Sequence, residues 1–315
     1  MISLRDVYSA RKRVQVWAHR TPMELSRPLS QMCGGEVWLK LENYQVTGSF
    51  KIRGATNKLL SLSEEERRRG VVTSSSGNHA QGVAYAAREL GVEATVVVPE
   101  QTPKVKVDAI RGYGVNLIVE GREYMDSERL ARRLERDEGL TFVSPYNDLD
   151  LIRGQATVAL EMVEDQPDLD VILVPVGGGG LASGVASVYK QATDATVIGV
   201  QSLTSPVMYE CIKKGHIHDV PLMDSVAEGL HGGLEEGSVT YKICRDLIDQ
   251  WIILEENAIL DAIGFMLHSH HMLVEGAAAV GPAAVMTEPG RFKGKRVGVV
   301  VSGGNLSEDT LRKIA

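Results

Sequence analysis

Apolar residues along the chain recur with two periods, and the change of period predicts where strands and helices lie. From Val37 to Leu41 every second residue is apolar, which is typical of a strand with one buried face. From Ile52 onward the apolar residues recur at helical spacing, so a helix is expected to begin near Lys51. Gly48 breaks the pattern between these two elements. Lys51 is therefore expected where a strand and turn lead into a helix.

The alternation of strand and helix continues over most of the chain, at a spacing typical of parallel sheets with helices on both faces. Further segments with a strand pattern are 71–73, 94–98, 115–119, 141–143, 171–176, 196–200 and 296–301. Segments with a helix pattern are 4–16, 78–90, 103–113, 123–136, 154–163, 181–191, 239–249, 257–273 and 277–286. Residues 202–237 are rich in Gly, Pro and His, and we expect substrate-side loops there. The pattern predicts an α/β protein with two parallel sheets.

Composition narrows the class of protein. The 315 residues are enough for one large α/β unit or for two domains of ordinary size. The chain has 34 basic and 41 acidic residues and no long cationic run, which argues against a nucleic-acid partner. Its three cysteines share no short ligand spacing and are expected to be free thiols in a reducing compartment. The first residues lack a signal-peptide core and no apolar run reaches membrane-spanning length, so we expect a cytoplasmic protein without a membrane partner.

Lys51 has two interpretations. It is either a solvated first-turn lysine beside Arg53, as most surface lysines are, or a lysine that forms a Schiff base with a carbonyl group. An amine that attacks a carbonyl must be neutral part of the time, and the apolar neighbours Phe50 and Ile52 would lower its pKa by desolvation. These residues alone leave both interpretations open.

A run of four glycines, residues 177–180, joins an apolar strand to a helix. Backbone N–H groups of such a loop converge, and the helix N-terminus adds its positive end, so the loop is a candidate anion site. It lacks the Lys-Ser/Thr pair of a nucleotide P-loop and the spacing of a dinucleotide fingerprint, which favours a single phosphate on a small cofactor. A tight turn without a ligand is the alternative, because glycines also allow close packing of strand and helix.

Two further polar loops follow predicted strands. Residues 74–81 contain more hydrogen-bonding groups than one N-cap requires, which suggests a carboxylate site, and Asn78 is also able to donate to a phenolate oxygen. Ser302 ends the last predicted strand, at the sheet edge where open parallel sheets bind ligands. For residues 302–305 a simple capped turn is an equally good explanation.

Together these motifs closely resemble the fold-type II pyridoxal-phosphate enzymes, and within them the threonine dehydratase and serine racemase branch. The resemblance covers essentially the whole chain and is carried by residues 49–54, 75–81, 177–180 and 302–305. It implies a tryptophan-synthase-β-like fold, with a large cofactor-binding domain of residues 1–49 and 148–315 and a small domain of residues 50–147. Four motifs in this order favour the Schiff-base interpretation of Lys51.

The resemblance also implies roles for individual residues. Lys51 would hold pyridoxal 5'-phosphate and remove the substrate α-proton. Residues implied to contact the cofactor are Phe50, Lys51, Asn78, Gly177, Gly178, Gly179, Gly180, Leu181, Glu228, Gly229 and Ser302. Residues implied to surround the substrate carboxylate are Ser75, Ser76 and His79. Because the Ser302 hydroxyl is neutral, it would not keep the ring nitrogen protonated, which favours loss of a β-substituent over a long-lived carbanion.

The implied activity is that of a pyridoxal-phosphate-dependent lyase of the threonine ammonia-lyase type. It would convert L-threonine, and also L-serine, to a 2-oxo acid and ammonia by β-elimination. Ser76 stands where racemases of the branch have a catalytic hydroxyl, so a serine or threonine racemase is the alternative. A non-catalytic ligand-binding protein is the alternative of another class, although such a protein has no need of Lys51. The family also implies a homo-oligomer, either a dimer or a tetramer.

Several residues depart from the family pattern or invite a different role. The chain ends soon after the Ser302 loop, so the regulatory domain of biosynthetic threonine dehydratases is expected to be absent. Gln201 stands where animal serine racemases have a metal-binding carboxylate, and no metal site is expected. His268 and His271 would share a helix face, but no acidic residue lies near enough to complete a metal site. Glu275 is expected to be a buried carboxylate stabilised by a helix N-terminus.

Overall fold

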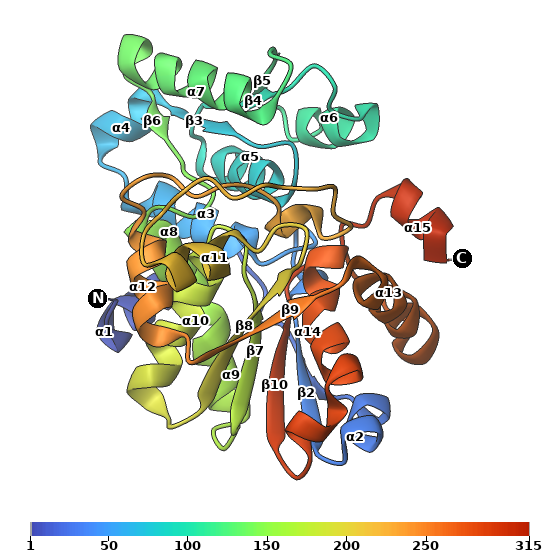
Figure 1. Ribbon diagram of the computed structural model, residues 1–315. Helices are drawn as coiled ribbons and strands as arrows, with labels where there is room; N and C mark the ends of the chain where they lie inside the picture. The colour runs from blue at the N-terminus through green and yellow to red at the C-terminus, as the bar shows by residue number, and fades with distance from the viewer. Residues whose placement is uncertain (1, 315) are drawn as a thin grey trace.

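The computed structural model describes residues 2–314, which form two sheets covered by helices (Figure 1). In spatial order the larger sheet contains β1 (Met23–Leu25), β2 (Glu36–Leu41), β10 (Arg296–Val301), β7 (Val171–Pro175), β8 (Thr196–Ser202) and β9 (Gln250–Leu254). The smaller sheet contains β5 (Asn116–Val119), β4 (Ala94–Val98), β3 (Val71–Ser74) and β6 (Thr141–Phe142). Neighbouring strands are parallel except β1, which is antiparallel to β2. The predicted α/β class is therefore confirmed.

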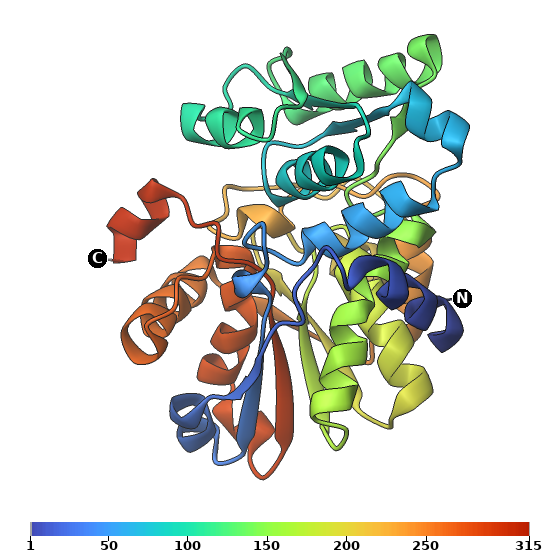
Figure 2. The same ribbon diagram turned by 180° about the vertical axis from the view of Figure 1, so that it is seen from behind.

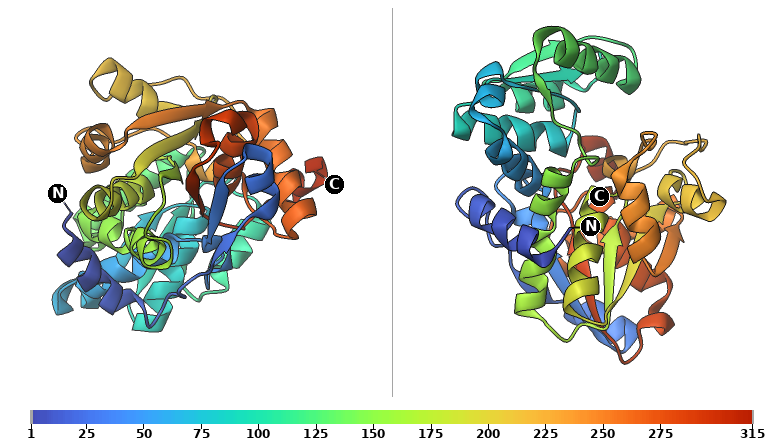
Figure 3. Two further views of the ribbon diagram at one scale, coloured as in Figure 1. Left: turned by 90° about the horizontal axis from the view of Figure 1, so that it is seen from below. Right: turned by 90° about the vertical axis from the view of Figure 1, so that its left-hand side faces the viewer.

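Both faces of the larger sheet are buried, because alternate strand residues enter two different apolar cores. Val297 and Val299 of β10 lie in one core, and Val300 lies in the other. The first core is covered by α2 (Arg27–Cys33), α13 (Glu256–His270) and α14 (Gly276–Thr287). The second is covered by α1 (Leu4–Val14), α8 (Leu149–Gln155), α9 (Thr157–Asp165), α10 (Gly180–Ala192), α11 (Val207–Lys214) and α12 (Val239–Leu247). The left view of Figure 3 shows these helices on both sides of the sheet.

The smaller sheet is covered in the same way. Val71 of β3 faces a core formed with α3 (Lys51–Ser61) and α5 (Asn78–Leu90), and Val72 faces a core formed with α7 (Tyr124–Glu138). Helices α3 and α5 lie between the two sheets, as Figure 2 shows from behind. The remaining elements are α4 (Glu64–Arg69), α6 (Lys104–Arg111), α15 (Glu308–Ile314), η1 (Glu42–Tyr44), η2 (Glu228–Leu230) and η3 (Pro289–Phe292).

The two sheets fall on either side of the predicted domain boundaries. Strands β3 to β6 belong to residues 50–147, and the strands of the larger sheet lie outside that range. The boundaries themselves stay a prediction. Within residues 2–314, no helix combines the length and the apolar character needed to cross a bilayer.

Some helices differ in extent from the prediction, and some elements were not predicted. One helix was predicted for residues 154–163, whereas the structure has α8 and α9. Helix α8 begins before residue 154, because the Asp148 side chain caps it by accepting from the backbone of Asp150 and Leu151 at 2.7 and 2.9 Å. Residues 202–237 are not all loop, since they contain α11, which ends at Gly215 with φ of +85°. Further α-helices and strands that were not predicted are β1, β9, α2, α4 and α15.

Candidate active site

The loops that the sequence singled out follow the carboxyl ends of parallel strands. Residues 177–180 follow β7, residues 302–305 follow β10, and residues 75–77 follow β3. These ends face the region between the two sheets, where α3 begins (Figure 1). The fold therefore brings the three loops to the neighbourhood of Lys51.

Lys51 is the first residue of α3, as predicted. Its Nζ donates a hydrogen bond of 2.7 Å to the backbone carbonyl of Pro145 and lies 5.4 Å from the centre of the Phe50 ring. Burial lowers the pKa of Lys51 to about 8, although the charge of Glu275 opposes this shift. At pH 7 about a tenth of the molecules thus carry the neutral amine that nucleophilic attack on a carbonyl requires.

Glycines allow neighbouring helices to pack directly against the first turn of α3. A Cβ on Gly82 of α5 would lie 3.1 Å from the backbone of Lys51 and Ile52. A Cβ on Gly54 would overlap the side chain of Gln155, whose Oε1 accepts from Gly54 N at 3.1 Å. The backbone that carries Lys51 is therefore enclosed between α5 and α8.

The Ser302 loop is joined directly to the Lys51 turn. The N–H of Phe50 donates to the carbonyl of Ser302 at 3.1 Å, and Ser49 and Gly303 form an isolated antiparallel bridge. Ser302 is only 2% exposed. The structure therefore brings Phe50, Lys51 and Ser302 together, although they come from distant parts of the chain.

Asn78 connects α5 to the start of α14 and to the loop that follows β10. Its Nδ2 donates to both carboxylate oxygens of Glu275, at 2.7 and 2.9 Å, and its Oδ1 accepts from Asn305 Nδ2 at 2.7 Å. Burial raises the pKa of Glu275 to about 7, although the Asn78 hydrogen bond opposes the shift. The expected dipole stabilisation at the start of α14 is therefore outweighed by desolvation.

Residues 75–77 lead from β3 into α5, which begins at Asn78. Ser75 and Ser76 are partly exposed, and among the described residues no backbone carbonyl accepts from the N–H groups of Ser75, Ser76, Asn78 or His79. His79 is buried, its Nε2 lies 3.0 Å from the carbonyl of Val143, and burial lowers its pKa to about 3. The His79 ring is therefore neutral. Its role beside a substrate carboxylate stays a prediction.

The glycine loop has the geometry of an anion cradle. Gly179 is the N-cap of α10 with φ of +87°, and a Cβ on Gly178 would overlap the ring of Tyr146. Within residues 2–314, no backbone carbonyl accepts from the N–H groups of residues 177–182. These donors at a helix N-terminus fit a phosphate group.

The cradle has a side wall that sequence reasoning missed. Tyr146 lies against residues 178 and 180, and its hydroxyl accepts from the N–H of Glu235 at 2.8 Å. Because Pro145 binds Lys51, the segment 145–146 connects the lysine to the glycine loop. In the sequence, the only signal that this segment contacts the site is the polar run from Tyr146 to Asp148.

Glu228 and Gly229 lie in η2, beside the cradle. A Cβ on Gly229 would lie 3.0 Å from the Cβ of Ala277, so the loop packs closely on α14. The Glu228 carboxylate is exposed and pairs with Lys106 Nζ at 2.5 Å. Its expected contact with the cofactor stays a prediction.

The residues considered for metal binding do not converge. No group of three or more His, Cys, Asp or Glu side chains in residues 2–314 is arranged to hold a metal ion. The side chain of Gln201 donates to the carbonyl of Val176 at 3.1 Å and accepts from Tyr209 N at 2.9 Å. His271 follows the end of α13 with φ of +55°, so it does not continue the helix face of His268.

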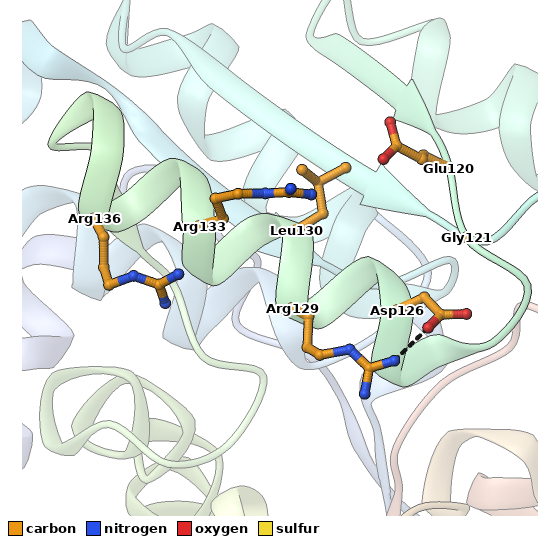
Figure 4. A pocket seen from close by; sticks show the side chains of 7 residues that line it. All are labelled: Glu120, Gly121, Asp126, Arg129, Leu130, Arg133 and Arg136. Carbon is orange, nitrogen blue, oxygen red and sulfur yellow. Dashed lines mark hydrogen bonds and ion pairs between the residues drawn. The ribbon is translucent and has the colours of Figure 1, made fainter.

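A pocket of about 440 Å³ lies on α7, in the part of the molecule that contains the smaller sheet (Figure 4). Its lining includes Arg129, Arg133 and Arg136, but their guanidinium groups point to different places, and Arg129 is paired with Asp126. None of the predicted site residues lines it. We therefore place the site at Lys51.

The residues around Lys51 fit pyridoxal phosphate. The N–H groups of residues 177–182 suit its phosphate, the Lys51 amine suits its aldehyde, and the Ser302 hydroxyl suits its ring nitrogen. Buried polar atoms of this region, Ser49 Oγ, Ser74 Oγ and His79 Nδ1, also lack partners among the described residues. Unpartnered polar atoms of this kind are typical of a ligand site.

Comparisons with known proteins agree with this arrangement. The chain is 42% identical to an L-threonine ammonia-lyase of Thermotoga maritima over all of this chain and 78% of that protein. It is 37% identical to a catabolic L-threonine dehydratase of Staphylococcus aureus, over 97% of this chain and 90% of the other. The solved structure of maize serine racemase superposes with a TM-score of 0.92 at 33% identity, covering 99% of this chain and 96% of that one. The family model for pyridoxal-phosphate dependent enzymes matches residues 14–303, and the chain therefore belongs to that family.

Proposed function

We propose that this chain is a pyridoxal-phosphate-dependent lyase that converts L-threonine, and also L-serine, to a 2-oxo acid and ammonia. The observation that carries the proposal is the Lys51 amine, which is bound to the Pro145 carbonyl and has its pKa lowered by burial to about 8. The similarity to an L-threonine ammonia-lyase and to an L-threonine dehydratase supports the choice of substrate.

Bound pyridoxal phosphate would supply an electron sink for the substrate α-carbon. In this proposal Lys51 accepts the α-proton, because its neutral form is populated near neutral pH. The N–H groups of residues 177–181 bind the phosphate, and those of Ser75 and Ser76 bind the substrate carboxylate. Asn78 would bind the phenolic oxygen through an amide N–H that has turned away from Glu275, to which its Nδ2 donates here.

The direct test is release of 2-oxo acid from a panel of 3-hydroxy amino acids. We expect L-threonine and L-serine to be turned over, with a preference set by one methyl group, which is worth about 1–3 kcal/mol. Absence of turnover by protein loaded with the cofactor would instead support a ligand-binding protein.

A racemase is the second candidate, favoured by the position of Ser76 and by the similarity to maize serine racemase. Elimination needs a base only on the Lys51 face, whereas inversion needs a proton donor on the other face. Ser76→Ala should therefore keep a substantial share of dehydration, while any racemase activity falls on the order of 100-fold or more. An equal drop of kcat in both reactions, with fold and cofactor content unchanged, would refute a two-base site.

We further propose that the protein is a cytoplasmic homo-oligomer, a dimer or a tetramer, and that residues 50–147 form its small domain. The three free, buried cysteines support a reducing compartment. Sedimentation at several protein concentrations tests the oligomeric state, and a monomer throughout would contradict it.

A further inference from the structure

Four charged side chains form a cluster in the core behind Lys51. Lys40, Glu42, Arg53 and Glu161 are 0, 0, 1 and 5% exposed. The cluster contains two positive and two negative groups, so it is neutral as a whole. Buried charges are tolerated when each is paired and hydrogen-bonded, and here all four are.

Arg53 uses its whole guanidinium group in this cluster. Its Nε and Nη2 donate to the two oxygens of Glu42, both at 2.8 Å, and its Nη1 and Nη2 donate to the two oxygens of Glu161, at 2.7 and 2.9 Å. Nη1 also donates to Thr157 Oγ1 at 3.1 Å, and Nη2 to the His19 carbonyl at 3.0 Å. Such paired contacts fix orientation as well as distance.

The partners of Arg53 belong to the larger sheet and its helices. Glu42 follows β2, and Glu161 lies on α9. Lys51 and Arg53 are two residues apart on α3, which places their side chains roughly 200° apart around the helix. The cluster thus holds the first turn of α3 from one side, while the Lys51 amine extends from the other side to Pro145.

We propose that Arg53 is a positioning residue for Lys51. Its contacts fix the first turn of α3 relative to the larger sheet, whose strand ends carry the glycine loop and Ser302. The inference rests on the proposed role of Lys51. Loss of these contacts would let the first turn shift, and a displacement of about 1 Å at a reacting group can cost about 100-fold in rate.

Lys40 provides a matched control. Its Nζ binds Glu161 at 2.6 Å and the Thr21 carbonyl at 2.7 Å, so Lys40→Met also removes one buried cation from the same cluster. Lys40 lies on β2, outside the helix whose first turn carries Lys51. Arg53→Met should lose more stability, because it also leaves Glu42 without a cation, and only Arg53→Met should displace the amine.

The experiment compares Arg53→Met, Arg53→Lys and Lys40→Met with the parent protein, each saturated with pyridoxal phosphate below its melting temperature. It measures kcat and KM for L-threonine and, by mass spectrometry after borohydride reduction, the fraction of cofactor attached to Lys51. For Arg53→Met we expect kcat to fall roughly 10- to 100-fold with KM changed less than about threefold, and the attached fraction to fall as well. For Arg53→Lys we expect kcat and the attached fraction to lie between those of Arg53→Met and the parent, because an ammonium group cannot reproduce the paired contacts of the guanidinium group.

A charge-balanced variant separates position from stability. The double variant Arg53→Met/Glu42→Gln lacks one buried charge of each sign. It should therefore be more stable than Arg53→Met alone, while it still lacks the paired contacts of the guanidinium group. Parent-like kcat and attachment in this double variant would overturn the inference, as would equal kcat losses in Arg53→Met and Lys40→Met. Parent protein that attaches no cofactor at Lys51 would instead overturn the proposed function.

Discussion

Lys51 and Arg53 stand two residues apart on α3, yet their surroundings push their pKa values in opposite directions. Lys51 has a neutral carbonyl as its hydrogen-bond partner, and burial lowers its pKa to about 8. Burial alone would also lower the pKa of Arg53, but Glu42 and Glu161 outweigh it and raise that pKa. Carboxylates in direct contact, rather than burial itself, decide which buried base is reactive and which is structural.

The largest effect on turnover is expected when Lys51, the reactive one of the two residues, is replaced. Lys51→Ala should lower turnover on the order of 1,000-fold or more and abolish borohydride attachment, because it removes both the anchor and the base. Lys58→Ala is the control, since Lys58 lies on the same helix and pairs with Asp148 at 2.6 Å. Undiminished activity of Lys51→Ala would contradict the assignment of the site.

The contribution of the Arg53 cluster to stability is tested by replacing two carboxylates of α9, one inside the cluster and one at the surface. Glu161→Ala leaves Arg53 and Lys40 short of a buried partner and should cost roughly 3–5 kcal/mol of unfolding free energy. Glu164 pairs with Arg11 and Arg20 at the surface, so Glu164→Ala should cost less than about 1 kcal/mol. Denaturant titration measures both. Equal losses of unfolding free energy in the two variants would show that the buried ion pairs stabilise the fold no more than the exposed ones do.

The pH dependence sharpens the same contrast. Below a pKa of about 8 the Lys51 amine is protonated, so attachment of pyridoxal phosphate to cofactor-free protein should slow about tenfold per pH unit as pH falls, and should level off above pH 8. Between about 8 and the ordinary value of 10.5 the unfolded chain binds more protons at this lysine than the folded one, so its contribution makes stability rise with pH. Stopped-flow absorbance gives the attachment rate, and a rate still rising tenfold per unit above pH 9 would mean an unshifted lysine.

The smallest effect is expected at the cysteines. All three are buried, and burial raises the pKa of Cys244 to about 12, so its thiol stays protonated. Replacing Cys33, Cys211 and Cys244 by serine should leave kcat within about threefold, with some loss of stability because buried hydroxyls need partners. A total loss of activity in a folded triple variant would reveal a role for a thiol.

Local pattern was enough to predict many elements. Helix α5 begins at Asn78 and ends at Leu90 as predicted, because Gly91 adopts φ of +64° and ends it. Strand β9 was missed, since no glycine or proline separates it from α12, and its extended form depends on pairing with β8. Boundaries set by local chemistry were therefore predictable, and those set by tertiary pairing were not.

The residues of the site also fall into those that local patterns indicate and those that only tertiary contacts reveal. Local patterns made Lys51 and the glycine loop candidates, whereas the bond between Asn78 and Glu275 joins residues 197 positions apart. No role was predicted for Arg53, because its partner Glu161 is 108 positions away. One sequence without tertiary information cannot distinguish a solvated arginine from a buried, paired one.

The position of β10 has a consequence for synthesis of the protein. It lies between β2 and β7 in the larger sheet, and the loop that follows it binds back to Thr47 across 258 residues. A nascent chain that has not yet left the ribosome through residue 305 has its sheet divided in two and its lysine turn unsupported. Formation of the site thus waits for long-range contacts that close only after residue 305 has emerged, and chains truncated before β10 should neither hold the cofactor nor turn over substrate.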